Sequence, residues 1–221
     1  MTSRRMDSQV KYWVTRPDNN RSLERIAHQG KLAMVSTKAK LWTVEDYHRM
    51  VETGILTSSD RVELLNGQII ETNPQLPPHA ATTQRAFRYL DRLLEKVAYV
   101  RMQLPVTLKP QSEPEPDIAI VRIDANEYGD RHPTPADIFL IIEVADSTLL
   151  SDRQQKAPIY ARAGIADYWI LDVNARQVYA FRKPTQAGYQ QEAILAANTI
   201  FAPLAFPDIT IPLNLLFLPN I

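Results

Sequence analysis

Apolar and polar residues follow two different periods along this chain, which predict helices and strands in turn. The first organised segment, residues 43–54 (TVEDYHRMVETG), predicts a short helix that begins at the N-cap Thr43 and ends at Gly54. Residues 62–72 (VELLNGQIIET) contain two apolar-rich runs joined by Asn-Gly, which is typical of a type I′ hairpin turn. Residues 79–97 carry an apolar stripe at helical spacing and predict an amphipathic helix.

The second half of the chain consists mainly of short apolar runs. Four of them read as strands, at residues 98–110, 116–122, 137–145 and 167–173. The segment before the last of these, residues 149–164, reads as a helix that Pro158 would kink. An antiparallel pair at 177–184 and 188–195 and a strand within 204–218 complete the chain. This order predicts one α/β domain, a mixed β-sheet flanked by helices, with an N-terminal β-hairpin and C-terminal antiparallel strands.

Composition narrows the class of protein. The 221 residues include no cysteine, which excludes disulfides and thiolate metal sites. Six glycines are too few and too scattered for a phosphate-binding loop or a dinucleotide fingerprint. No apolar stretch approaches the ~20 residues that span a bilayer, so we expect no membrane segment.

The net charge of zero conceals an asymmetry. Residues 1–40 hold 9 Lys+Arg and 3 Asp+Glu, whereas residues 41–221 hold 16 and 22. We predict a basic, flexible extension over residues 1–40 and a folded domain over residues 41–221. The extension reads either as a basic arm for nucleic acid or as a start-site artefact, since Met34 precedes the first patterned segment.

One acidic residue interrupts an apolar run. Glu143 lies within FLIIEVADST, residues 139–148, a strand of the kind buried on both faces of a sheet. A carboxylate there needs a partner, a proton or a metal. Asp117 opens the preceding strand after Pro116, and Lys156 lies in the following helix. If the two strands are neighbours, all three side chains converge.

Such a set suits metal-assisted hydrolysis of a phosphodiester. Two carboxylates and a backbone carbonyl can hold Mg²⁺ or Mn²⁺ and leave positions for water and a phosphate oxygen. A lysine ammonium can orient the water and offset negative charge. The other reading is structural: Glu143 and Lys156 form a buried ion pair that holds the helix on the sheet, and Asp117 is a turn residue.

The same residues carry a resemblance to a known family. PDIAIV, FLIIEVADSTLLSDRQQKAPIYARAG and DYWILDV, together with the early hairpin VELLNGQII, resemble the Uma-two family over residues 41–215. These bacterial proteins are described as putative restriction endonucleases of the PD-(D/E)xK nuclease-like superfamily. The resemblance implies Asp117 and Glu143 as metal ligands, Lys156 as the catalytic lysine and Glu63 as an additional acidic group.

The resemblance further implies a metal-dependent endonuclease acting on DNA, a homodimer and a location in the bacterial cytoplasm. One departure opens an alternative. The E-x-K lysine of the general nuclease pattern is absent, since Ala145 stands two residues after Glu143. If Lys156 does not replace it, the chain is a catalytically inactive nuclease-fold binding or regulatory module.

Four further polar residues near these motifs have less specific readings. His79 follows two prolines in a position that suits a helix cap; it reads as a structural or rim residue, with metal ligand as the alternative. Asp152 reads as solvated or paired with Lys156, four residues later. Tyr160 and Tyr168 are expected to pack in the core.

Overall fold

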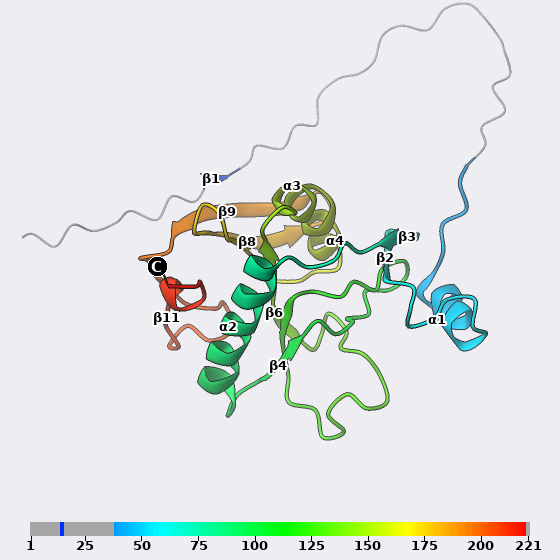
Figure 1. Cartoon of the computed structure of the whole chain (residues 1–221), viewed down its shortest axis with the longest axis horizontal. Coiled ribbons are helices and arrows are strands. Elements are labelled where there is room, and N and C mark those ends of the chain that lie inside the picture. Colours follow the sequence, from blue (N-terminus) through cyan, green and yellow to red (C-terminus); the bar gives the residue numbers. More distant parts are fainter. Residues whose placement is uncertain (1–13, 16–37, 220–221) are drawn as a thin grey trace, which may run out of the picture.

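The computed structural model describes residues 14–15 and 38–219 (Figure 1). Its helices and strands are, in chain order, β1 (Val14–Thr15), α1 (Val44–Glu52), β2 (Val62–Leu65), β3 (Gln68–Glu71), α2 (Pro77–Leu94), β4 (Tyr99–Met102), β5 (Ile118–Val121), β6 (Ile138–Ala145), α3 (Leu149–Ser151), the π-helical turn η1 (Asp152–Lys156), α4 (Ala157–Arg162), β7 (Asp167–Asp172), β8 (Gln177–Thr185), β9 (Gly188–Ala196), β10 (Ile200–Phe201), β11 (Ile211–Pro212) and the 3₁₀ turn η2 (Leu213–Leu215). The predicted extension, residues 1–40, falls almost entirely outside the described residues.

The main sheet has the strand order β1-β9-β8-β7-β6-β5-β4. All neighbouring strands are antiparallel except β6 and β7, which are parallel and are joined through α3, η1 and α4. A parallel pair requires such a crossover, whereas the antiparallel pairs can be joined by turns. The prediction of a mixed sheet with flanking helices is confirmed, and the strands of Asp117 and Glu143 are neighbours.

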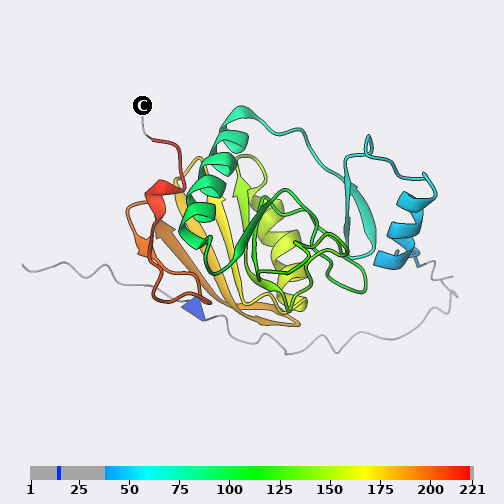
Figure 2. The same cartoon turned by 90° about the horizontal axis from the view of Figure 1, so that it is seen from below.

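Both faces of the sheet are covered (Figure 2). One face packs against α2 and the C-terminal segment, and its core includes Leu90, Ile142, Trp169 and Phe217. The other face packs against α4, with Ile141 and its neighbours in the second core. Alternate residues of β6 therefore enter different cores, which is why that strand reads as an unbroken apolar run. Glu143 points to the α4 side.

The hairpin β2–β3 and helix α1 follow their local sequence signals. Thr43 caps α1 through a reciprocal capping box with Asp46. Asn66 and Gly67 have φ angles of 49° and 76°, as a type I′ turn requires. A side chain at Gly67 would also meet its neighbours, because a Cβ built there lies 2.6 Å from the Leu41 Cβ and 3.0 Å from the Trp42 backbone oxygen.

Three element predictions need correction. The predicted strand 98–110 ends at Met102, because Gln103 turns the chain with a φ of 53° and a long loop follows. The C-terminal strand within 204–218 is only β11, two residues long. The predicted helix over 149–164 is divided by the π turn η1, immediately before α4 with its Pro158, and there the Ala157 N–H donates to the Asp152 carbonyl five residues back.

Replacing Gly67 tests the close approach in the hairpin. We expect Gly67→Ala to lower the free energy of unfolding by about 2 kcal/mol or more, because it adds a backbone clash to an unfavourable positive φ. Gly54→Ala is the matched control: Gly54 has a φ of 73° but nothing within 4 Å of the added Cβ. Urea unfolding that gave equal losses for the two variants would contradict the steric argument.

Candidate active site

The pairing of β5 and β6 brings two carboxylates together. Ile118 pairs with Ile142, so the next position along the antiparallel register sets Asp117 opposite Glu143. Two hydrogen bonds connect the strands here: the Val144 N–H on β6 donates to Asp117 Oδ2 at 2.8 Å, and the Asp117 backbone N–H donates to Glu143 Oε2 at 3.4 Å. The apolar runs that dictate the strands therefore dictate the meeting of the two acids.

Glu143 is 2% exposed and receives two side-chain donors on one oxygen. Lys156 Nζ, at the end of η1, donates to Glu143 Oε1 at 3.1 Å. The hydroxyl of Tyr160, on α4, donates to the same oxygen at 2.7 Å. The crossover between the parallel strands thus delivers both donors, and Tyr160 has a polar role that the sequence reading did not assign to it.

Asp117 is held from three directions. Besides the Val144 N–H, its Oδ2 lies 3.1 Å from Nε2 of His79, in the first turn of α2. Its Oδ1 accepts a longer hydrogen bond from the Gln103 side chain at 3.3 Å. His79 does not cap its helix, since Leu76 occupies the N-cap, so the predicted capping role is wrong. The histidine instead links α2 to the acidic group.

The hairpin contributes a third acid to the same place. Glu63, on β2, is buried, and its Oε1 lies 3.6 Å from Lys156 Nζ. Its Oε2 accepts a hydrogen bond from the Glu115 N–H at 3.2 Å. Glu115 itself is exposed, and partial desolvation together with the Glu63 charge raises its pKa. Nothing in the sequence reading pointed to Glu115.

Asp152 is the fourth acid of this group. It is buried, at 4% exposure, so the solvated alternative is wrong. Thr148 donates to its Oδ2 at 2.7 Å, and Tyr168 donates to its backbone carbonyl at 3.2 Å. We call the four acids, Glu63, Asp117, Glu143 and Asp152, together with Lys156, the acid cluster.

Negative charge exceeds positive charge in the acid cluster. Burial raises the pKa of Glu143 to about 8, and the Asp117, Asp152 and Glu63 carboxylates add to the rise although Lys156 opposes it. Burial likewise raises the pKa of Asp152 to about 6, against the effect of Lys156. One ammonium therefore does not balance the acids that surround it.

For the two basic groups of the site, burial and the neighbouring carboxylates shift the pKa in opposite directions, and the carboxylates have the larger effect. Burial alone would lower the pKa of Lys156, but Glu143, Glu63 and Asp152 raise it well above its usual value. Burial also opposes protonation of His79, yet the hydrogen bond and the charge of Asp117 raise the pKa of that imidazole. Lys156 therefore stays an ammonium at neutral pH, able to donate hydrogen bonds but not to act as a base.

The donor set of the acid cluster fits a hard divalent cation. No group of three His, Asp or Glu side chains among the described residues is arranged as a ready metal cage. Mg²⁺ does not need one, because it is commonly held by one or two carboxylates and completes its shell with water and substrate phosphate. Asp117 and Glu143 supply two carboxylates from neighbouring strands, and the uncompensated charge around them would be relieved by a cation.

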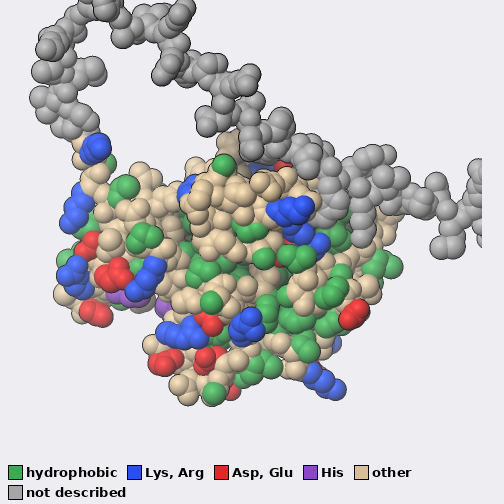
Figure 3. Space-filling model, turned by 180° about the vertical axis from the view of Figure 1, so that it is seen from behind, with side chains coloured by type: hydrophobic (Ala, Val, Ile, Leu, Met, Phe, Trp, Pro, Cys, Tyr) green, Lys and Arg blue, Asp and Glu red, His purple; other side chains and the backbone are tan. Residues whose placement is uncertain are grey.

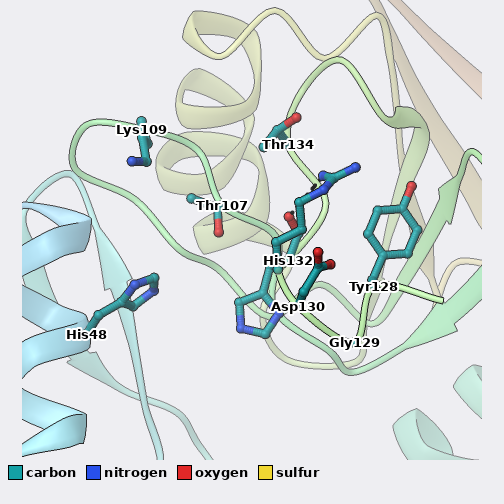
Figure 4. Close-up of a pocket in the computed structure, with 9 residues that line it drawn as sticks. His48, Thr107, Lys109, Tyr128, Gly129, Asp130, His132 and Thr134 are labelled. Carbon is teal, nitrogen blue, oxygen red and sulfur yellow. Dashed lines mark hydrogen bonds between the residues drawn. The ribbon is translucent and has the colours of Figure 1, made fainter. Parts of the chain in front are cut away.

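A separate hollow of about 470 Å³ lies between α1 and the loops around residues 107 and 132 (Figure 4). His48 and His132 face each other across it. Buried Glu113 accepts from the Thr107 hydroxyl at 2.6 Å and pairs with His48 at 2.8 Å. No member of the acid cluster lines this hollow, which therefore does not belong to the candidate active site.

Comparison with known proteins places this architecture in a family. The family model Uma2, described as "Putative restriction endonuclease", matches residues 44–214. The chain belongs to the Uma-two family. No curated protein matches the sequence.

A solved structure has the same fold as this Uma-two chain. It is the crystal structure of "a putative nuclease belonging to DUF820" from Anabaena variabilis. It superposes with a TM-score of 0.62 at 15% sequence identity and covers 79% of this chain and 97% of the other. At that identity the likeness shows the fold alone.

Among the described residues, no helix is long and apolar enough to cross a membrane.

The structure brings together all four residues that the Uma-two resemblance singled out: Glu63, Asp117, Glu143 and Lys156. Their catalytic and metal-binding roles stay predictions. It also adds contacts from Tyr160 and His79, which connect elements far apart in the sequence and which no local pattern could assign.

The pKa of Glu143 gives a test of the charge surplus in metal-free buffer. Because the pKa is raised in the folded state from 4.5 to about 8, its contribution to stability is present below pH 4.5 and lost as pH rises through 8. Over that window we expect wild type to lose stability relative to Glu143→Gln, by up to roughly a factor of ten in folding equilibrium per pH unit. Urea unfolding with chelator across pH 5–9 measures this, and parallel stability curves would contradict it.

Proposed function

We propose that this Uma-two protein is a metal-dependent endonuclease that hydrolyses DNA phosphodiester bonds. The observation that carries the proposal is the Lys156 ammonium, 3.1 Å from a buried carboxylate that a second carboxylate meets across the β5–β6 pair. A structural ion pair would need one acid for one base. Here several acids share one lysine, and Glu143 keeps a raised pKa in spite of it.

Each side chain has a role that its environment supports. Asp117 and Glu143 would hold Mg²⁺ or Mn²⁺, which when bound would activate water and stabilise charge on the phosphate. Lys156, a permanent cation, would donate to the attacking water or to a phosphate oxygen. Glu63 keeps Lys156 in place from the hairpin side. Tyr160 orients Glu143 by its hydrogen bond to Oε1.

The inactive-module alternative rested on the missing E-x-K lysine. Ala145, at that position, is fully buried in the sheet. The ammonium that the pattern lacks on β6 is supplied from η1 instead, within hydrogen-bonding distance of Glu143. This geometry favours the catalytic reading over a module that only binds. Because both strands of a duplex must be cut, we further propose that the protein acts as a homodimer, which light scattering would test.

Cleavage is the direct test. We expect Glu143→Gln to reduce Mg²⁺-dependent nicking and linearisation of plasmid DNA by at least about 10²-fold, because the isosteric amide removes the charge of one ligand. Asp172→Asn is the matched control, a buried carboxyl of β7 that bonds to a turn N–H outside the acid cluster. Cleavage by Glu143→Gln at the wild-type rate would refute the proposal, as would equal losses in the two variants.

Metal affinity is measured independently of any substrate. We expect calorimetric titration with Mn²⁺ to show near-stoichiometric binding to wild type, lost in Glu143→Gln and retained in Asp172→Asn. Binding that survives in Glu143→Gln would remove Glu143 from the ligand set. Absence of binding to wild type would return Glu143 and Lys156 to the role of a structural pair.

A further inference from the structure

A second groove, of about 760 Å³, follows the outer side of α2, away from the acid cluster. Its lining residues come from α2 and, across the groove, from η2: Ala81, Gln84, Arg85, Arg88, Tyr89, Arg92, Leu93 and Leu215. The α2 residues recur at intervals of three and four, so they form one continuous strip along the helix. Neither the nuclease motifs nor the acid cluster accounts for this strip.

Three arginines lie on the strip, and two of them have no ion-pair or hydrogen-bond partner for the side chain among the described residues. Arg85 donates from Nε to the Leu215 carbonyl at 3.1 Å, which fixes one wall of the groove. Arg88 and Arg92 are exposed, and no described residue forms an ion pair or side-chain hydrogen bond with either. Other arginines of the described chain do have carboxylate partners, such as Arg131 with Asp137.

The arginines are spaced for a polyanion. From Arg85 to Arg92 the helix rises ~10 Å, which corresponds to about three phosphates of one nucleic-acid strand. Guanidinium groups bind phosphates through paired N–H donors. On the opposite face of the molecule, by contrast, Lys and Arg side chains are interspersed with Asp and Glu (Figure 3). The lining of the groove on α2 includes three arginines and no carboxylate.

An aromatic ring lies among the arginines. Tyr89, partly buried beside the core, occupies the strip between Arg88 and Arg92. A positive groove with an aromatic platform is the arrangement by which proteins hold single-stranded nucleic acid. The chain's own basic extension, with 9 Lys+Arg against 3 Asp+Glu over residues 1–40, has the wrong charge to occupy it.

We propose that the α2 groove binds a single nucleic-acid strand, with phosphates on Arg88 and Arg92 and a base against Tyr89. The inference rests on the proposed function and specifies its substrate: nucleic acid with a single-stranded segment beside the cleaved bond. Helix α2 joins the two sites, because His79 in its first turn contacts Asp117 and the groove begins at Ala81. The two lie on opposite sides of the helix, and the proposed phosphate contacts at Arg88 and Arg92 are ~14 and ~20 Å along its axis from His79.

Binding without metal separates this inference from catalysis. Fluorescence anisotropy of a labelled 20-nucleotide single strand, and of the matching duplex, is measured with the full chain in chelator at several salt concentrations. We expect the Arg88→Gln/Arg92→Gln double variant to bind the single strand at least tenfold more weakly. The slope of log binding constant against log salt concentration should become shallower by about 1.4, because two phosphate contacts are lost. The Arg61→Gln/Lys183→Gln double variant, which removes two exposed cations elsewhere, should bind like wild type.

The aromatic platform has its own pair of variants. Tyr89→Leu keeps an apolar side chain but removes the ring, and we expect it to weaken single-strand binding roughly fivefold or more. Tyr89→Phe keeps the ring and should retain binding. Neither change should alter duplex binding, in which bases are already stacked.

Four results would each overturn the inference: no single-strand binding by wild type, unchanged binding by the Arg88/Arg92 variant, equal loss in the Arg61/Lys183 control, or wild-type affinity in Tyr89→Leu. A change of oligomeric state in the Arg88/Arg92 variant, seen by light scattering, would also overturn it by making the groove an interface between copies. None of these results depends on cleavage. A chain that binds the strand but never cuts would refute the proposed endonuclease activity and leave the groove assignment standing.

Discussion

The ammonium of Lys156 connects three parts of the chain that are separate in sequence. It donates to Glu143 on β6 and lies beside Glu63 on the hairpin, while its own backbone belongs to the crossover between β6 and β7. A hydrophobic core covers each face of the sheet, so little water screens the carboxylates of the acid cluster from one another. Without a buried cation these acids would repel one another or take up protons.

A second buried carboxylate shows what a purely structural solution looks like in the same sheet. Asp167, on β7, is fully buried and receives two hydrogen bonds from Arg182, one from the Trp169 indole and one from the Leu204 N–H. Each oxygen of Asp167 is fully occupied by donors from its immediate neighbourhood. Glu143 has a different environment: one oxygen takes both strong donors, and the other has only a 3.4 Å contact. The fold can therefore supply two donors to each oxygen of a buried acid, and it does not do so at Glu143.

Local sequence was a good guide wherever a local cause determined the outcome. The apolar run around Glu143 and the Pro-Asp before β5 sufficed to predict the two strands, and predicted converging carboxylates on the condition, met in the structure, that the strands are neighbours. Asn-Gly predicted the hairpin turn. The burial of Asp152 was harder to predict, because Asp152 lies in a π turn that the helical periodicity of the segment does not indicate. The hydrogen bond of Tyr160 to Glu143 and the contact of His79 with Asp117 require tertiary packing. The first joins residues 17 positions apart and the second residues 38 positions apart. The prediction of a strand over 98–110 was wrong for another reason. Residues typical of strands continue beyond Met102, but a positive φ at Gln103 and the prolines that follow end the strand.

The π turn η1 sets the rotational phase between the two halves of the crossover helix. Lys156 lies at its end and Tyr160 lies one turn beyond it, yet both reach the same oxygen of Glu143. A π turn accommodates one residue more than an α-turn, and Pro158, which has no N–H to continue an α-helical ladder, follows directly. Loss or gain of one residue here would rotate everything on one side of the turn by about 100° relative to the other. In evolutionary terms, the segment can tolerate substitutions at its surface but hardly a change in length.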